Sequence, residues 1–162
     1  MKIILLSIIL AATMHAGAQL KTTTKCATIV VDLLDGKVNG AEPKFTPSQI
    51  KGLLPCFTSE EPENEESKCG GGVFYKDNDI YFYTGRDYIE IREKFKGKLT
   101  IPVMGAARNG LFQWLGNPKL KDTNFDVYTT SYGMMIVYFN KANKVNKIQF
   151  TTKSMEEIQL CQ

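Results

Sequence analysis

Several short stretches of the chain alternate apolar and polar side chains with a period of two, a pattern typical of strands in a half-buried sheet. The order Ile80-Tyr81-Phe82-Tyr83, for example, sends one pair of side chains to each face. Residues that favour turns separate these stretches from one another. We predict strands over 28–34, 73–75, 80–84, 88–91, 125–129, 134–139 and 145–151, with a weaker strand at 38–41.

Two other segments carry signals of short helices. The run Thr46-Pro47-Ser48-Gln49 places a threonine at the N-cap, a proline at the first helical position and a glutamine at the third, and Pro55 ends the helix. A second helix is predicted over 106–115, before Gly116 and Pro118. Together these elements predict an α+β fold, in which an antiparallel sheet carries short helices on one face.

The order of the elements occurs twice along the chain. Units 46–92 and 106–151 each run from a short helix through a polar loop into three strands. Residue identity between the units is low, so both an internal duplication and a chance similarity of two α-β-β-β stretches remain open. In either case we expect 19–162 to form a single α+β domain.

Tyrosines mark one face of the predicted sheet. If Ile80 and Phe82 face the helices, then Tyr81 and Tyr83 lie on the open face, where Tyr128 and Tyr138 are the candidates to join them. Tyrosine is common at protein interfaces because a rigid amphipathic ring buries area at little entropic expense. These four residues are the predicted binding residues, and the alternative is that they form ordinary cross-strand pairs on a half-wet sheet.

The first eighteen residues have the pattern of a signal peptide. Lys2 supplies a positive charge, 3–12 form a short apolar run, and Ala16-Gly17-Ala18 is a small-x-small cleavage site. The apolar run is about ten residues, too short to cross a membrane that requires roughly 20. We therefore expect cleavage between Ala18 and Gln19, an exported mature protein (periplasmic or extracellular) and no membrane insertion.

The four cysteines all lie beyond this segment. An even number in an exported chain predicts two disulfides, and four cysteines allow three pairings. We favour Cys56–Cys69 as a short loop and Cys26–Cys161 as a tie between the two ends. A zinc site is the alternative, but the spacing lacks the paired ligands of zinc motifs.

The mature sequence offers few groups for catalysis. The only histidine of the full chain, His15, lies in the predicted signal peptide. Cysteines that are paired in disulfides provide no free thiol. Asp87 and Glu90 flank a strand on opposite faces, so we expect a turn acid and a solvated strand residue rather than a catalytic pair. The acidic stretch 60–66 lacks the alternating ligands and glycine of a calcium loop, and we expect a solvated loop there. We predict no enzymatic activity, no cofactor and no metal.

A string in the second unit resembles a known family. It comprises Leu115-Gly116-Asn117-Pro118, Phe125-Asp126-Val127-Tyr128, 132–139 and 144–148. This order resembles the β-lactamase-inhibitor-protein-like fold, which is shared with BamE-type small outer-membrane assembly lipoproteins. The resemblance implies two α-β units in one antiparallel sheet with a concave binding face, and a Cys56–Cys69 bridge is in keeping with the inhibitor proteins. The chain lacks the lipid-bearing cysteine of the assembly lipoproteins.

These features favour an exported binding module. We expect it to bind or inhibit an unidentified protein partner through the open face of the sheet. The mature net charge of +2 is too small to indicate nucleic acid binding. The alternative function is an envelope carrier or structural protein that binds a small apolar ligand between sheet and helices.

Overall fold

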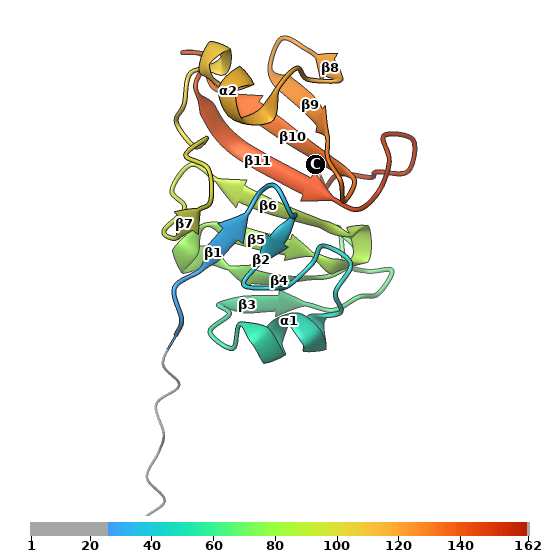
Figure 1. Cartoon of the computed structure of the whole chain (residues 1–162). Coiled ribbons are helices and arrows are strands. Elements are labelled where there is room, and N and C mark those ends of the chain that lie inside the picture. The colour runs from blue at the N-terminus through green and yellow to red at the C-terminus, as the bar shows by residue number, and fades with distance from the viewer. Residues whose placement is uncertain (1–25, 162) are drawn as a thin grey trace, which may run out of the picture.

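The computed structural model describes residues 26–161, and the predicted signal peptide lies outside them. The fold is α+β and is built on one eight-stranded antiparallel sheet, whose strands follow the order β3-β4-β5-β6-β11-β10-β9-β8 (Figure 1). In chain order the strands of this sheet are β3 (Ser59–Glu61), β4 (Gly72–Tyr75), β5 (Ile80–Tyr83), β6 (Tyr88–Arg92), β8 (Leu120–Lys121), β9 (Phe125–Thr129), β10 (Met134–Phe139) and β11 (Val145–Thr151).

One face of this sheet, here called the core face, carries the main hydrophobic core. The register aligns Phe82 with Ile89, Ile89 with Phe150, and Phe150 with Met135. These side chains form one apolar row across β5, β6, β11 and β10, and all are nearly inaccessible to solvent. The row is continuous because the antiparallel register puts residues of the same face opposite each other in every strand.

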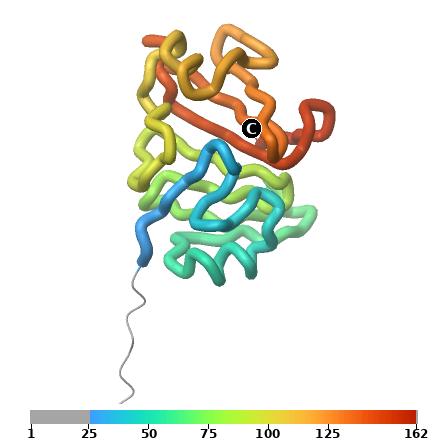
Figure 2. Tube along the Cα trace, in the orientation of Figure 1, coloured from blue at the N-terminus to red at the C-terminus, as the bar shows by residue number. Residues whose placement is uncertain are grey.

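A second layer covers the core face. It contains a small sheet of order β2-β1-β7, formed by β2 (Lys37–Val38), β1 (Val30–Asp32) and β7 (Lys98–Leu99), with β1 and β7 parallel. The helices α1 (Pro47–Leu53) and α2 (Phe112–Leu115) belong to the same layer, α2 in front of the β10–β11 half (Figures 1 and 2). The opposite face of the large sheet is here called the back face.

The predicted first helix is confirmed. Thr46 caps α1 through a hydrogen bond from the Gln49 backbone N–H, and the Gln49 side chain accepts one from the Thr46 backbone N–H. The helix ends at Leu53, and its cap residue Leu54 precedes Pro55, which cannot continue it.

The predicted second helix, 106–115, is much shorter in the structure. A single 3-10 turn (Arg108–Gly110) precedes α2. Ala107 is extended instead and bridges to Lys144, and the Ala106 carbonyl accepts a hydrogen bond from the Val145 N–H. Pairing with the start of β11 thus takes the backbone groups that a longer helix would use.

The structure contains two disulfides, but the predicted pairing is wrong. Cys26 is bonded to Cys56, and Cys69 to Cys161, with Cα–Cα distances of 5.7 and 5.4 Å. The chain between Cys56 and Cys69 runs through the edge strand β3, and the two cysteines lie on different sides of the sheet. Cys56 lies beside α1 in the covering layer, whereas Cys69 packs with Phe74 on the back face. Within 26–161 we find no helix with the length and apolarity needed to span a membrane.

The acidic stretch 60–66 is only partly the predicted loop. Its first residues belong to β3, an edge strand that pairs with β4, and Glu60 forms an ion pair with Lys51 of α1 at 2.8 Å. Residues 62–66 are exposed, as expected for a solvated loop.

Candidate functional site

The back face is organised into cross-strand rows that pass from β5 and β6 to β11 and β10. The middle row aligns Tyr81 with Glu90, Glu90 with Gln149, and Gln149 with Ile136. A second row aligns Arg92 with Lys147, Lys147 with Tyr138, and Tyr138 with Phe125. Two strands that carry polar side chains therefore meet at the centre of the sheet, at the junction of β6 and β11.

Glu90 is the centre of this arrangement. Only 4% of it is exposed, yet its carboxylate is surrounded by donors. Oε1 accepts a hydrogen bond from Arg92 Nε at 2.5 Å, Oε2 accepts one from Gln149 Nε2 at 2.6 Å, and Lys147 Nζ lies 3.9 Å away. A buried charge is tolerated only when it is paired and hydrogen-bonded, and Glu90 meets both conditions. The prediction that Glu90 is solvated is therefore wrong.

Three tyrosines contact the two residues, Arg92 and Gln149, that donate hydrogen bonds to this carboxylate. Arg92 donates from Nη2 to Tyr83 Oη at 3.2 Å, and its guanidinium lies over the Tyr81 ring at 4.0 Å. Tyr138 donates to Gln149 Oε1 at 2.7 Å. The resulting set is here called the polar cluster: Tyr81, Tyr83, Glu90, Arg92, Tyr138, Lys147 and Gln149.

The tyrosine hydroxyls of the polar cluster are held in the protonated state. Burial raises the pKa of Tyr138 to about 12, and the nearby Glu90 charge acts in the same direction. Burial and Glu90 likewise raise the pKa of Tyr83, where Arg92 opposes them. These hydroxyls are hydrogen-bond donors and contact groups at neutral pH, and their pKa values do not suit them to act as bases.

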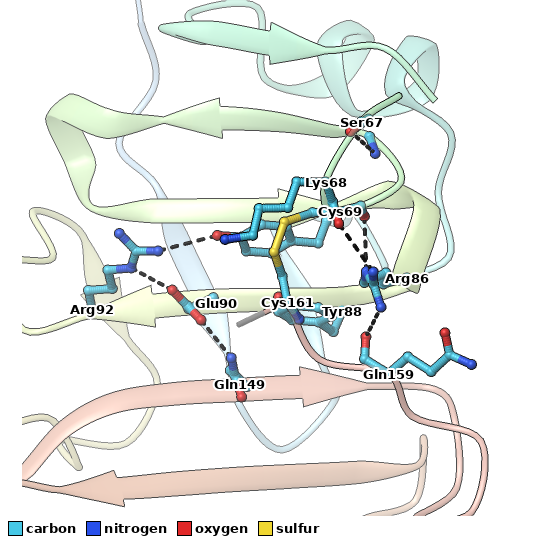
Figure 3. Close-up of a disulfide and its surroundings, with 12 residues drawn as sticks. Ser67, Lys68, Cys69, Arg86, Tyr88, Glu90, Arg92, Gln149, Gln159 and Cys161 are labelled. Atoms are coloured by element: carbon cyan, nitrogen blue, oxygen red, sulfur yellow. Dashed lines mark hydrogen bonds and ion pairs between the residues drawn. A yellow bond between two sulfur atoms is a disulfide. The ribbon is translucent and has the colours of Figure 1, made fainter. Parts of the chain in front are cut away.

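The C-terminal segment 152–161 covers one end of the back face. It ends at the Cys69–Cys161 disulfide, and Arg86 donates hydrogen bonds to the carbonyl oxygens of Cys69 and Gln159 (Figure 3). Tyr83 lies near this end and is only 8% exposed. The back face, which was predicted to be open, is therefore accessible at the end that carries Arg92 and Lys147 and covered at the other end.

Tyr128 does not join the other predicted tyrosines. It is aligned with Met135 and lies on the core face, where it is 4% exposed. Its neighbour Val127 faces the back instead and is 3% exposed, because the C-terminal segment covers it. Since both faces of β9 are buried, alternation alone could not identify which face Tyr128 occupies.

Sequence reasoning missed Arg92, Lys147 and Gln149. A usable signal exists, because Glu90 and Arg92 flank Ile91 in β6, and Lys147 and Gln149 flank Ile148 in β11. Two polar residues at period two within a buried central strand indicate a paired network on one face. Asp87, the other acid considered, lies in a turn with a left-handed backbone and forms an ion pair with Lys153 at 2.9 Å.

A shallow groove adjoins the open end of the polar cluster. Its volume is about 590 Å³, and its lining includes Asp79, Arg92, Lys94, Asn124, Tyr138 and Lys147. Arg92 and Lys147 are the partly exposed cations of the cluster, with 44% and 33% of their side chains accessible. The groove thus offers cations and aromatic rings side by side.

A second groove, of about 580 Å³, lies on the opposite side of the sheet near α2. Its floor is an ion pair in which Arg108 donates from Nη2 and Nε to the two oxygens of Asp126, at 2.6 and 3.2 Å. The remaining Arg108 hydrogen bonds go to the carbonyl oxygens of Asp122 and Thr123. With Asp126 almost fully buried, this pair connects the 3-10 turn that precedes α2 to β9.

Comparison with models of known protein families, with characterised proteins and with solved structures finds no match for this chain. The chemistry of the polar cluster is therefore the main guide to function. It contains partly exposed cations beside aromatic rings and hydroxyls. Its one carboxylate accepts hydrogen bonds from Arg92 and Gln149 and lies 3.9 Å from Lys147 Nζ.

Proposed function

We propose that this chain is an exported protein-binding module whose binding surface is the open end of the back face. The surface consists of Tyr81, Arg92, Tyr138 and Lys147, with the adjoining groove. The observation that carries the proposal is the pairing of each cation with a tyrosine ring over the buried Glu90.

This pairing favours tight association with a protein. Tyrosine and arginine are the residue types that most often dominate binding energy at interfaces. Here both are already held in place, because Arg92 bonds to Glu90 and Tyr138 bonds to Gln149. Side chains ordered before association lose less entropy when the partner binds.

Other features favour binding over catalysis. The four cysteines of the described chain are all in disulfides, and Glu90 is only 4% exposed, with both carboxylate oxygens accepting hydrogen bonds. Disulfides are typical of proteins in oxidising compartments, which supports export. We therefore propose a binding or inhibitory role without enzymatic activity.

The strand order supports the proposed likeness to the β-lactamase-inhibitor-protein-like fold. β4, β5 and β6 follow α1, whereas β9, β10 and β11 follow α2. The third strands of the two groups, β6 and β11, lie side by side and antiparallel. This is the arrangement expected if two α-β-β-β units are related by an approximate twofold axis.

The alternative carrier function finds less support. A small apolar ligand would have to lie between the sheet and its covering layer. Within the described residues that space is filled by large side chains such as Leu33, Ile50, Tyr75 and Phe82, each 2% exposed or less.

A capture experiment tests the proposal. The protein is attached to a support through its N-terminal end, exposed to the material into which its host exports it, and bound proteins are cross-linked and identified. The double variant with Tyr81→Ala and Lys147→Ala should no longer capture the partner protein. Lys141→Ala, a change of an exposed lysine elsewhere, should leave capture unchanged.

Tyr83→Ala is unsuitable as a test variant because Tyr83 is buried. Equal capture by all variants would contradict the proposal, and native mass spectrometry showing a bound small molecule would favour the carrier function.

A further inference from the structure

The C-terminal segment 152–161 covers an apolar patch of the back face. Beneath it lie Tyr83, Tyr88, Val127, Met134 and Ile136, here called the covered patch, each no more than 8% exposed. Ile158 packs against the Val127–Met134–Ile136 part, and Leu160 packs against both that part and the two tyrosines. Two aliphatic side chains, two residues apart, thus fill the patch.

The non-covalent attachment of this segment is sparse. At its start, Lys153 pairs with Asp87, and the Lys153 N–H donates to Thr151 Oγ1 at 3.1 Å. Further along, Arg86 donates to the Gln159 carbonyl at 3.3 Å, and the Cys161 N–H donates to Tyr88 Oη at 3.1 Å. Among the described residues, the segment forms no strand and no backbone–backbone hydrogen bond with the sheet. Each hydrogen bond or ion pair that joins the segment to the rest of the described chain involves at least one side chain.

The disulfide therefore carries most of the attachment. Ordering a ten-residue segment has a large entropic penalty, which a partly exposed ion pair, three hydrogen bonds and two half-buried aliphatic side chains offset only in part. The Cys69–Cys161 bond removes much of that penalty by fixing the far end of the segment.

We propose that the covered patch is an interaction surface for an extended segment of another protein that carries two aliphatic side chains two residues apart. In the oxidised protein Ile158 and Leu160 occupy it, and reduction of Cys69–Cys161 vacates it. The carbonyl between the two aliphatic residues of the partner accepts the hydrogen bond that Arg86 now donates to Gln159. The surface is distinct from the open end of the back face and does not depend on the function proposed for it.

Release proceeds by thiol–disulfide exchange with an external dithiol. One thiolate of the dithiol attacks the Cys161 sulfur, which is the more exposed of the two, and Cys69 leaves as a thiolate. The second thiol of the dithiol then attacks the mixed disulfide and releases Cys161 as a thiol. The protein gains two electrons and two protons, and the dithiol becomes a disulfide.

The first test measures whether the segment opens. Ile136→Cys places a thiol within the covered patch, and its rate of alkylation is compared with and without Cys69→Ser and Cys161→Ser. We expect at least a hundredfold faster alkylation in the absence of the disulfide, with the far-ultraviolet spectrum unchanged. Equal rates would overturn the proposal.

The second test measures recognition. A full-length variant with Cys69→Ser, Cys161→Ser, Ile158→Asp and Leu160→Asp cannot reseat its own segment. A fluorescent peptide of residues 153–161 with Cys161→Ser should bind this variant at least tenfold more tightly than it binds the oxidised protein. The same peptide carrying Ile158→Asp and Leu160→Asp should lose that gain. Equal binding of the two peptides would refute recognition of aliphatic side chains, and a dimer of the Cys69→Ser, Cys161→Ser protein in size-exclusion chromatography would reassign the patch to the segment of a second copy.

Discussion

Gln149 donates a hydrogen bond of 2.6 Å from Nε2 to Glu90 Oε2 across the junction of β6 and β11. The same amide accepts a hydrogen bond from Tyr138, while Glu90 accepts one from Arg92. The two halves of the large sheet are thus connected by side chains as well as by strand pairing. One buried carboxylate determines the relative position of tyrosines that come from opposite halves.

Removal of this carboxylate should destabilise the protein. In Glu90→Ala, Gln149 Nε2 loses its acceptor inside the sheet, and Arg92 and Lys147 repel each other without a counter-charge. We expect the free energy of unfolding to fall by about 2 to 3 kcal/mol, less than for a fully buried pair because Arg92 can rehydrate. Urea titration measures the change, and Glu93→Ala, on an exposed neighbour, should have little effect.

The disulfides make separate contributions to stability. In the chain-entropy model, loops closed by sequence separations of 30 and 92 residues stabilise the fold by about 3.5 and 4.5 kcal/mol. Cys69→Ser with Cys161→Ser should therefore lower the urea midpoint more than Cys26→Ser with Cys56→Ser. Peptide mapping under non-reducing conditions should recover Cys26 joined to Cys56, and a Cys56–Cys69 peptide would contradict the observed pairing.

Stability should fall in strongly alkaline solution. Burial raises the pKa of both Tyr128 and Tyr138 to about 12, above the usual value of about 10. Because the folded state holds these protons more tightly, the associated stabilisation is complete below pH 10 and is lost as pH rises toward 12. Urea titrations across this range, with Tyr138→Phe as the comparison, should show a smaller loss in the variant. A loss of the same size in both proteins would exclude a contribution from Tyr138.

Gly36 should be intolerant of any side chain. Its φ of +65° is unfavourable for other residues, and a Cβ there would overlap the Tyr132 ring. The Tyr132 hydroxyl also donates to the Leu33 carbonyl at 3.0 Å, so the ring cannot easily move away. We expect Gly36→Ala to lower the free energy of unfolding by about 2 to 4 kcal/mol. Gly40→Ala is the matched control, with a φ of +87° and no atom within 4 Å of the added carbon, and should lose about 1 kcal/mol in thermal or urea unfolding.

Local features of this fold could be predicted from the sequence, because they depend on neighbouring residues. The capping box of Thr46 and Gln49 and the alternation in Ile80-Tyr81-Phe82-Tyr83 are examples. The pairing of Cys69 could not be predicted, because it depends on the β3 edge around which the chain passes to the back face. The position of Tyr128 could not be predicted either, since the distant segment that contains Ile158 buries the other face of β9.

The proposed binding site also combines features that could and could not be predicted from the sequence. Tyr81 and Tyr138 were predicted from their strands alone, and they lie on the predicted face. The function of Glu90 as a common acceptor depends on β11 lying next to β6, a contact between residues 59 positions apart. No local pattern specifies that neighbour, although the polar residues at period two in both strands suggest it in retrospect.

The position of Cys161 has a practical consequence for handling this protein. Because Cys161 is bonded to Cys69 and packs with Tyr83 and Tyr88, a tag, dye or fusion partner appended at the C-terminal end would lie close to the covered patch. Residue 26, by contrast, lies with α1 in the opposite layer. Attachment through the N-terminal end keeps a label away from the back face, whereas a C-terminal label would obstruct the covered patch.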